Sequence, residues 1–264
     1  MQERFVRRIP EVTVWYWVVL TLTATLGQAV AALLSDVLGL GLTLTTAATM
    51  ATLSGALVVQ FAGHRYSAFR YWVVLILIST VGTLLVDDMV DNLEVPAEAA
   101  TATFALALAA TFAVWRTRQR TLSLRTIDTP SREGYYWLAV LFALALGKAA
   151  GDLTAERLGL GYAPATAILT GLVAVVAAGH RLLGLDAVLA FWVAFLLTRQ
   201  LGGAAGDLLA RPADDGGLGF GTTQTSLAFL AVVAGVIVYL ASTRRDAPPA
   251  YLVRPAGLRT EGDR

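Results

Sequence analysis

Ionisable side chains occur inside long apolar stretches of this sequence, and they have the greatest capacity for chemistry in the chain. Lys148 lies four residues before Asp152 in one stretch, so the two can pair on one face of a helix. Arg199 lies eight residues before Asp207 in a second stretch, and Asp87 stands in a third. At the centre of a bilayer such a charge costs about 2.5–3.5 kcal/mol on insertion scales. We therefore expect these side chains to be paired or hydrated and to face away from lipid.

Lys148 stands out because the chain contains 19 arginines and one lysine. A buried lysine can lose its proton, whereas arginine effectively cannot. Lysine can also take the place of a bound cation beside carboxylates, or form a Schiff base with a carbonyl compound. The structural alternative is that arginine is too large for this position. A retinal-type Schiff base fits poorly, because the chain does not have the seven spans of a rhodopsin.

Eight stretches of the chain are long enough to cross a bilayer, since about 20 helical residues span its hydrocarbon core. They cover about residues 14–34, 43–61, 71–90, 97–115, 135–155, 163–179, 187–209 and 222–241. Hydrophobic residues form 56% of the chain and the mean hydropathy is +0.65. Charged residues form 15%, against about 25% in soluble domains. The composition excludes a soluble enzyme, a disordered chain and a coiled coil, and predicts an all-α integral membrane protein in the lipid bilayer.

Several kinds of site are missing from the sequence. The absence of cysteine excludes disulfides, thiolate metal sites and cysteine nucleophiles, and a net charge of +1 gives no sign of a nucleic-acid partner. No HExxH, GxSxG or Walker motif occurs. We therefore expect no catalytic residue, no cofactor and no metal site, and a protein that is not an enzyme.

Arginine is distributed unequally between the two sides that eight crossings create. Sixteen arginines fall on the side of both termini, and Arg157 and Arg211 fall on the other. Because positive residues collect on the cytoplasmic side, this asymmetry predicts an N-in/C-in topology. Residues 116–134 would then be a cytoplasmic loop and residues 244–264 a cytoplasmic tail. The first stretch is too long, and too similar to the others, for a cleaved signal peptide.

A two-span unit occurs four times in the chain. The odd-numbered stretches align without gaps, each with an aromatic residue, then tryptophan, then glycine ten residues later. The repeats cover about 11–65, 66–120, 131–185 and 186–243 of a single membrane domain, 1–264. Because each unit crosses twice, we expect eight transmembrane helices in four parallel two-helix repeats, with the odd-numbered helices inside.

Small and aromatic residues in these stretches predict how the helices pack. GxxxG pairs let helix backbones approach closely in lipid. The glycines expected at helix contacts are Gly27, Gly82, Gly147, Gly151, Gly202 and Gly206. The tryptophans expected to form an aromatic belt at the cytoplasmic surface are Trp17, Trp72, Trp137 and Trp192.

One face of each odd-numbered stretch carries the polar residues. It contains the positions 7, 11 and 15 residues after the tryptophan, which lie ~10, ~16 and ~22 Å from the tryptophan level. The candidate pathway residues on this face are Gln28, Thr83, Asp87, Lys148, Asp152, Arg199 and Asp207. At position 19, expected at the outer surface, stand Asp36, Asp91, Glu156 and Arg211. With six carboxylates and three cationic groups, the charged stripe formed by these residues has a net charge of −3.

This charged stripe has two interpretations. It either forms a structural ion-pair network in a non-transporting scaffold or sensor, or it lines a polar pathway. Ionisable groups inside a bundle built from repeats favour the pathway. The sequence thus predicts a secondary transporter or channel-like protein for a small cation or polar solute. It gives no substrate, direction, coupling ion or oligomeric state.

The four repeats resemble a family of bacterial membrane proteins of unknown function, the uncharacterised membrane-anchored proteins. The resemblance rests on the tryptophan that opens each repeat and on a Gly-x-x-x-x-Asp element, and it covers about residues 11–243. It implies a multi-pass protein of the bacterial cytoplasmic (inner) membrane. It also implies acidic residues at the positions of Gln28 and Ala32, and this sequence lacks both carboxylates.

Overall fold

A computed structural model describes residues 8–38, 41–63, 66–159 and 161–247, and all regular structure in these ranges is helical. The long helices are α1 (Val14–Leu38), α2 (Leu42–Ala62), α3 (Ala68–Asp87), α4 (Ala97–Gln119), α5 (Pro130–Leu158), α6 (Tyr162–Leu182), α7 (Ala187–Ala210) and α8 (Thr222–Thr243). Within the described ranges, eight helices are long and apolar enough to cross a membrane. The predicted all-α membrane fold is therefore confirmed.

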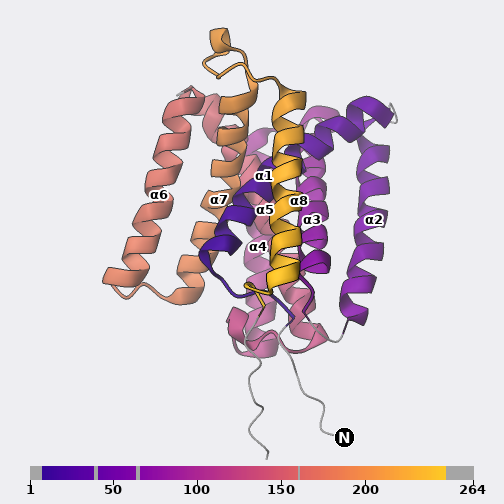
Figure 1. Ribbon diagram of the computed structural model, residues 1–264, viewed down its shortest axis with the longest axis vertical. Helices are drawn as coiled ribbons and strands as arrows, with labels where there is room; N and C mark the ends of the chain where they lie inside the picture. Colours follow the sequence, from indigo (N-terminus) through magenta and orange to yellow (C-terminus); the bar gives the residue numbers. More distant parts are fainter. Residues whose placement is uncertain (1–7, 39–40, 64–65, 160, 248–264) are drawn as a thin grey trace, which may run out of the picture.

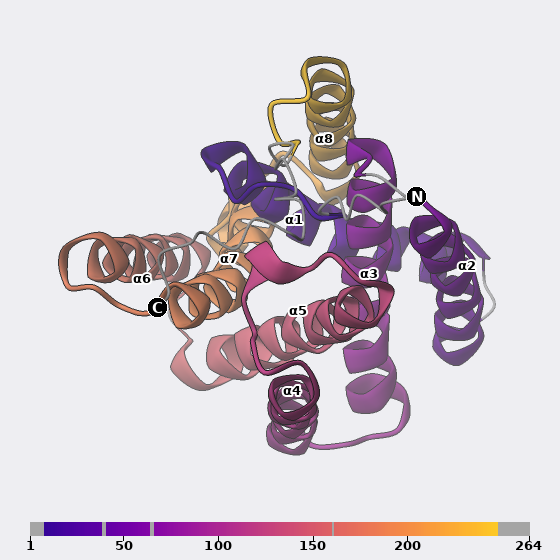
Figure 2. The same cartoon turned by 90° about the horizontal axis from the view of Figure 1, so that it is seen from below.

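The odd-numbered helices form a closed ring at the centre of the molecule. Helix α1 packs against α3 and α7, and α5 packs against the same two helices (Figure 2). The even-numbered helices lie outside this ring, with α2 and α6 on opposite flanks (Figure 1). Each even-numbered helix packs chiefly against the odd-numbered helix that follows it, and α8 closes the circle by packing on α1. The closure joins the last repeat to the first.

Residues at the starts of the odd-numbered helices meet, so these four helices run in the same direction. The hydroxyl of Tyr71 hydrogen bonds with that of Tyr136 and donates to that of Tyr16 across 3.4 Å. The Phe191 ring centroid lies 6.0 Å from that of Tyr16. Aligned sequence positions therefore occupy equivalent places in a parallel four-fold arrangement.

Four equivalent glycines mark close approaches between neighbouring helices of the ring. Each faces the next odd-numbered helix, and the contacts join Gly27 to Ser79, Gly82 to Ala145, Gly147 to Arg199 and Gly202 to Thr21. A Cβ at Gly202 would lie 2.6 Å from the Thr21 carbonyl oxygen, which is closer than real Cβ atoms approach. Gly206 is similarly close to Thr25, whereas Gly151 has only ordinary contacts with Gln200. Glycine thus sets the spacing of the inner helices.

The turns before the even-numbered helices also repeat. Gly41, Gly161 and Gly221 precede α2, α6 and α8 with φ of 76°, 75° and 81°. Side chains rarely adopt this backbone conformation, so glycine permits the same reversal in three repeats. Pro96 precedes α4 in the remaining repeat. Between α4 and α5 the helices extend into both ends of the segment expected as a loop, 116–134.

The predicted tryptophan belt is wrong. Trp72, Trp137 and Trp192 are buried inside the bundle and Trp17 is half-buried, so they do not form a surface for lipid. The reason is the parallel ring, which brings the four aromatic pairs at the helix starts together around one axis. Their rings pack against one another, with the Tyr71 and Trp137 centroids 5.2 Å apart.

Candidate functional site

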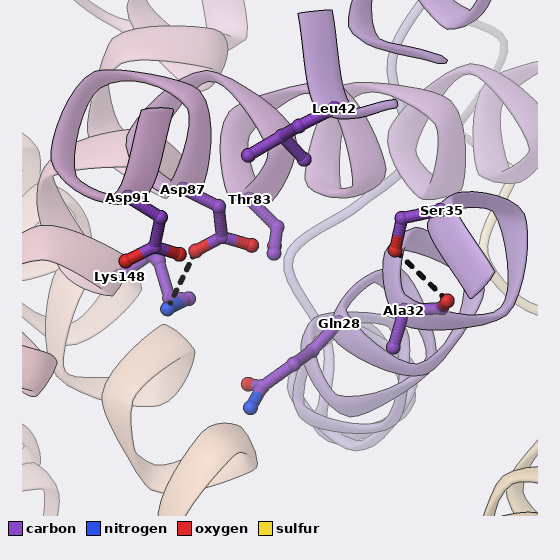
Figure 3. A pocket seen from close by; sticks show the side chains of 8 residues that line it. All are labelled: Gln28, Ala32, Ser35, Leu42, Thr83, Asp87, Asp91 and Lys148. Atoms are coloured by element: carbon purple, nitrogen blue, oxygen red, sulfur yellow. Dashed lines mark hydrogen bonds and ion pairs between the residues drawn. The ribbon is translucent and has the colours of Figure 1, made fainter. Parts of the chain in front are cut away.

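Lys148 contacts carboxylates from two helices. Its ammonium group pairs with Asp152, one turn further along α5, as the four-residue spacing predicts. Its Nζ also lies 3.1 Å from Oδ1 of Asp87 on α3 (Figure 3). The Lys148 side chain is 13% exposed, so two carboxylates balance a nearly enclosed cation.

Arg199 is buried more deeply and crosses the axis of the ring. It starts on α7, and its Nη2 donates to Thr83 Oγ1 on α3 across 3.0 Å. Its stem passes over Gly147 of α5, where a Cβ would lie 2.8 Å from Arg199 Cγ. Glycine at this position therefore leaves the space through which the arginine reaches the opposite helix.

The guanidinium of Arg199 forms no ion pair with any carboxylate in the described ranges. Asp207, two turns away on the same helix, instead lies 3.8 Å from Nε of Arg211. Arg199 Nε also has no hydrogen-bond partner among the described residues. The sequence spacing suggests a carboxylate partner on the same helix for both cations. In the structure Lys148 is paired with two carboxylates, whereas Arg199 is bound by a neutral hydroxyl.

A cavity of about 400 Å³ opens beside these residues. Its polar lining consists of Gln28, Ser35, Thr83, Asp87, Asp91 and Lys148 (Figure 3). Four of the seven predicted pathway residues therefore share one cavity. Asp152 and Arg199 are attached to it through Lys148 and Thr83, whereas Asp207 is bound to Arg211 away from this lining.

Exposure increases along the stripe with distance from the tryptophans. Arg199 is 1% exposed, and the side chains of Lys148, Asp87 and Asp152 are 13%, 27% and 43% exposed. The cavity therefore opens toward the end of the bundle that is farther from the tryptophans. The side chains of Asp36 and Glu156, also expected at that end, lie outside the described residues.

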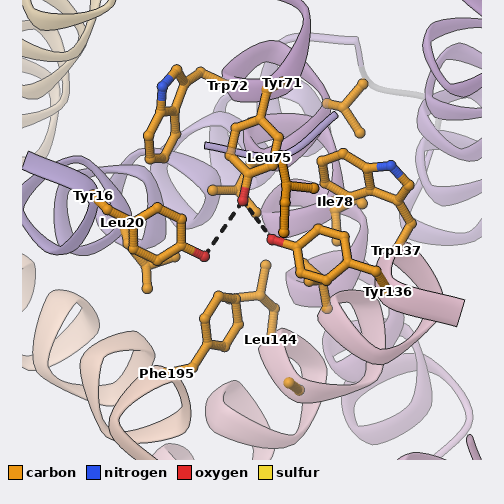
Figure 4. Close-up of a cluster of buried hydrophobic side chains, with 14 of the residues drawn as sticks. Tyr16, Leu20, Tyr71, Trp72, Leu75, Ile78, Tyr136, Trp137, Leu144 and Phe195 are labelled. Atoms are coloured by element: carbon orange, nitrogen blue, oxygen red, sulfur yellow. Dashed lines mark hydrogen bonds between the residues drawn. The ribbon is translucent and has the colours of Figure 1, made fainter. Parts of the chain in front are cut away.

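The opposite end of the ring is filled by apolar side chains. Three residues after each tryptophan stands a fully buried residue, namely Leu20, Leu75, Val140 and Phe195. The tyrosines and tryptophans at the helix starts belong to the same buried cluster (Figure 4). The cavity thus ends inside the bundle.

Two buried carboxylates at this closed end were missed by the sequence analysis. Glu133 is fully buried, lies 3.1 Å from Arg8 Nη1, and accepts hydrogen bonds from Gln60 at 2.8 Å and Trp137 at 3.4 Å. Its position four residues before Trp137, on the same helix face, was the available signal.

The second carboxylate, Asp246, follows α8. It is fully buried and accepts from the Tyr66 hydroxyl and from Trp72 Nε1, the latter across 3.3 Å. Burial and the nearby Asp246 carboxylate raise the pKa of Tyr66. Tyr66 and Asp246 are 180 residues apart in sequence, so no local pattern predicts their contact.

The described residues contain no group of three or more His, Asp or Glu side chains placed to hold a metal ion. The Lys148 ammonium lies between two carboxylates instead. The site is a polar cavity lined by two carboxylates and one ammonium group, and the buried Arg199 guanidinium is bound to Thr83 in its lining.

The comparisons with known proteins place the chain by its repeats. A family described as Repeat of Unknown Function (DUF347) matches residues 70–121, 135–183 and 190–246. The first repeat, which lacks carboxylates at Gln28 and Ala32, lies outside the matched segments. No curated protein and no solved structure matches the chain. With three repeats matched over more than half of its length, this multi-pass membrane protein belongs to the DUF347 repeat family.

Proposed function

We propose that this protein is a secondary transporter or channel-like protein for a small cation or polar solute, with the charged stripe as its pathway. The supporting observation is the cavity of about 400 Å³ lined by Asp87, Asp91 and Lys148, which brings charged groups from α3, the turn after it and α5 to one opening. A purely structural ion-pair network has no need of such a cavity. A pathway open at one end and closed at the other is the arrangement expected of a gated transport protein in one of its states.

The proposal includes a location and an orientation. The protein would lie in the bacterial cytoplasmic membrane with both termini inside, because 16 arginines stand on the side of the termini and two on the other. The aromatic end would then face the cytoplasm and the cavity mouth the outside. In this conformation, solutes would enter the cavity from the outer side of the membrane.

Charge favours cations over free anions at the mouth. The cavity lining carries two carboxylates, Asp87 and Asp91, and one ammonium group, Lys148, for a formal charge of −1. A concave surface of one sign concentrates ions of the other sign. We expect neutralisation of Asp87 to lower cation uptake, and anion uptake that is indifferent to Asp87→Asn would contradict this.

The proposal is tested by flux into proteoliposomes with a panel of monovalent cations and small neutral or zwitterionic solutes. The wild type and Lys148→Arg are compared, because arginine keeps the charge but cannot release its proton. Arg157→Met is the matched control, since it removes a charge from an exposed pair with Glu98 outside the cavity. Flux in the wild type and control that is reduced in Lys148→Arg supports the proposal.

A folded wild-type protein that carries none of these solutes would leave the scaffold or sensor as the better account. The double pairing of Lys148 is the observation that favours that account. In that case Lys148 would matter for stability alone.

A further inference from the structure

Arg199 has a buried charge that the described carboxylates leave without an ion pair. It is 1% exposed, and its Nη2 donates to the neutral hydroxyl of Thr83 across 3.0 Å. Its Nε has no partner among the described residues. Lys148, which is less buried, contacts both Asp87 and Asp152. A buried charge without a direct ion pair is costly, and Asp87, Asp152 and Asp207 act on Arg199 only from beyond ion-pair distance.

The Arg199 guanidinium and the Gln28 amide come together over Gly203. A Cβ at this glycine would lie 3.4 Å from Gln28 Oε1 and 3.6 Å from Arg199 Nη1. The missing side chain therefore leaves the amide of α1 and the guanidinium of α7 beside the same space. Gln28 and Thr83 also line the cavity, and the Gln28 side chain extends into it (Figure 3).

We propose that the floor of the cavity binds the carboxylate of a small solute that also carries an ammonium group. The solute's carboxylate would meet the Arg199 guanidinium and the Gln28 amide, since a guanidinium can donate two parallel hydrogen bonds to a carboxylate. Its ammonium group would meet Asp87 and Asp91, which line the same cavity. The inference rests on the proposed transport function and narrows its substrate class to small zwitterions.

The arrangement of charge disfavours solutes with a single charge. A free anion must pass the carboxylates Asp87 and Asp91, and a simple cation meets Lys148 in the lining and the Arg199 charge buried behind Thr83. Only a solute with both charges offers a partner to both ends of the cavity. A volume of about 400 Å³ is ample for a small amino acid and falls in the ordinary range of ligand sites.

The test is thermal unfolding of the purified full chain in detergent with matched probes. Glycine, L-alanine, β-alanine and γ-aminobutyrate carry both charges at increasing separation, whereas propionate and propylamine carry one charge each. We expect at least one zwitterion to raise the unfolding temperature in a concentration-dependent way. Neither singly charged probe should do so at the same concentration.

Two variants locate the binding site. Gln28→Glu places a carboxylate beside Arg199, so the protein should stay folded while zwitterion affinity falls by about a hundredfold through like-charge repulsion. Arg157→Met is the control, because it changes the net charge by the same amount at an exposed ion pair outside the cavity. This control should keep its zwitterion affinity within a few-fold of the wild type.

Three results would overturn the inference: no shift with any of the four zwitterions, an equal shift with a singly charged probe, or unchanged affinity in Gln28→Glu. Flux of a cation without zwitterion binding would overturn only this inference and leave the transport proposal standing. Zwitterion binding without flux would support the binding site and contradict transport. The two failures are therefore distinguishable.

Discussion

Lys148→Met should destabilise the protein by about 2–3 kcal/mol. The substitution removes the ammonium group shared by Asp87 and Asp152 and keeps an unbranched apolar side chain. Breaking a fully buried ion pair costs about 3–5 kcal/mol. These two carboxylates are 27% and 43% exposed, so solvent in the cavity compensates part of the loss.

Because Asp87 is a second partner of Lys148, removing Asp152 should restore less stability to Lys148→Met than the sequence spacing alone suggests. Adding Asp152→Leu to Lys148→Met would restore stability if Asp152 were the single partner. Because Asp87 lies 3.1 Å from the lysine and is the less exposed carboxylate, we expect this double variant to recover about 1 kcal/mol. The triple variant with Asp87→Asn should come within about 1 kcal/mol of the wild type, since no carboxylate is left without its cation.

Unfolding free energies of the wild type and the single, double and triple variants in detergent provide the measurement, and flux is recorded on the same samples. Lys148→Met with wild-type stability would refute the ion-pair argument. A triple variant no more stable than Lys148→Met would refute the role of Asp87. A stable triple variant with full flux would remove this cluster from the pathway, whereas a stable and silent one would contradict a purely structural role.

Three further predictions concern the rest of the molecule. A reporter active only outside the cytoplasm and fused after Arg245 should give no signal, and a strong signal would contradict the N-in/C-in topology. Gly202→Ala should cost about 1–3 kcal/mol, because its Cβ would lie 2.6 Å from a backbone oxygen of α1. Gly171→Ala, with no atom within 4 Å of its Cβ, should be neutral or stabilising by up to about 1 kcal/mol, and an equal loss in both would contradict the packing argument. Glu133→Ala should cost about 3–5 kcal/mol in the same unfolding assay by leaving Arg8 and two further donors without their acceptor, and a neutral result would argue against a role in holding the closed end together.

The arrangement of the helices can be predicted from the sequence because its main features recur in each repeat. Apolar stretches of the right length predict the helices, and the aligned tryptophans and glycines predict that the odd-numbered helices are equivalent and inside. In contrast, the sequence does not predict which odd-numbered helix each even-numbered helix packs against. Helix α2 packs chiefly on α3 rather than on α1, and no residue pattern within one span specifies that choice.

The partners of the charged residues were only half predictable. Lys148 and Asp152 share a helix, so their spacing gives the pair, but Asp87 reaches Lys148 from another helix whose rotation the sequence does not reveal. Arg199 and Asp207 are well spaced on one face yet have other partners. Gly147 leaves the space in which the Arg199 side chain turns toward α3. A glycine in the sequence does not by itself indicate which side chain will occupy the space beside it.

Similarity and difference between the repeats therefore carry separate information. Where the aligned positions agree, as at Gly27, Gly82, Gly147 and Gly202, each residue serves the same contact between neighbouring helices. Where they disagree, eleven residues after the tryptophans, they supply a glutamine, a threonine, a lysine and a glycine in turn. The four-fold arrangement places these four residues at the same depth around one axis. Because their side chains differ chemically, they can form a binding site at that depth. A repeat protein of this kind is thus best searched for function at the equivalent positions where its copies differ most.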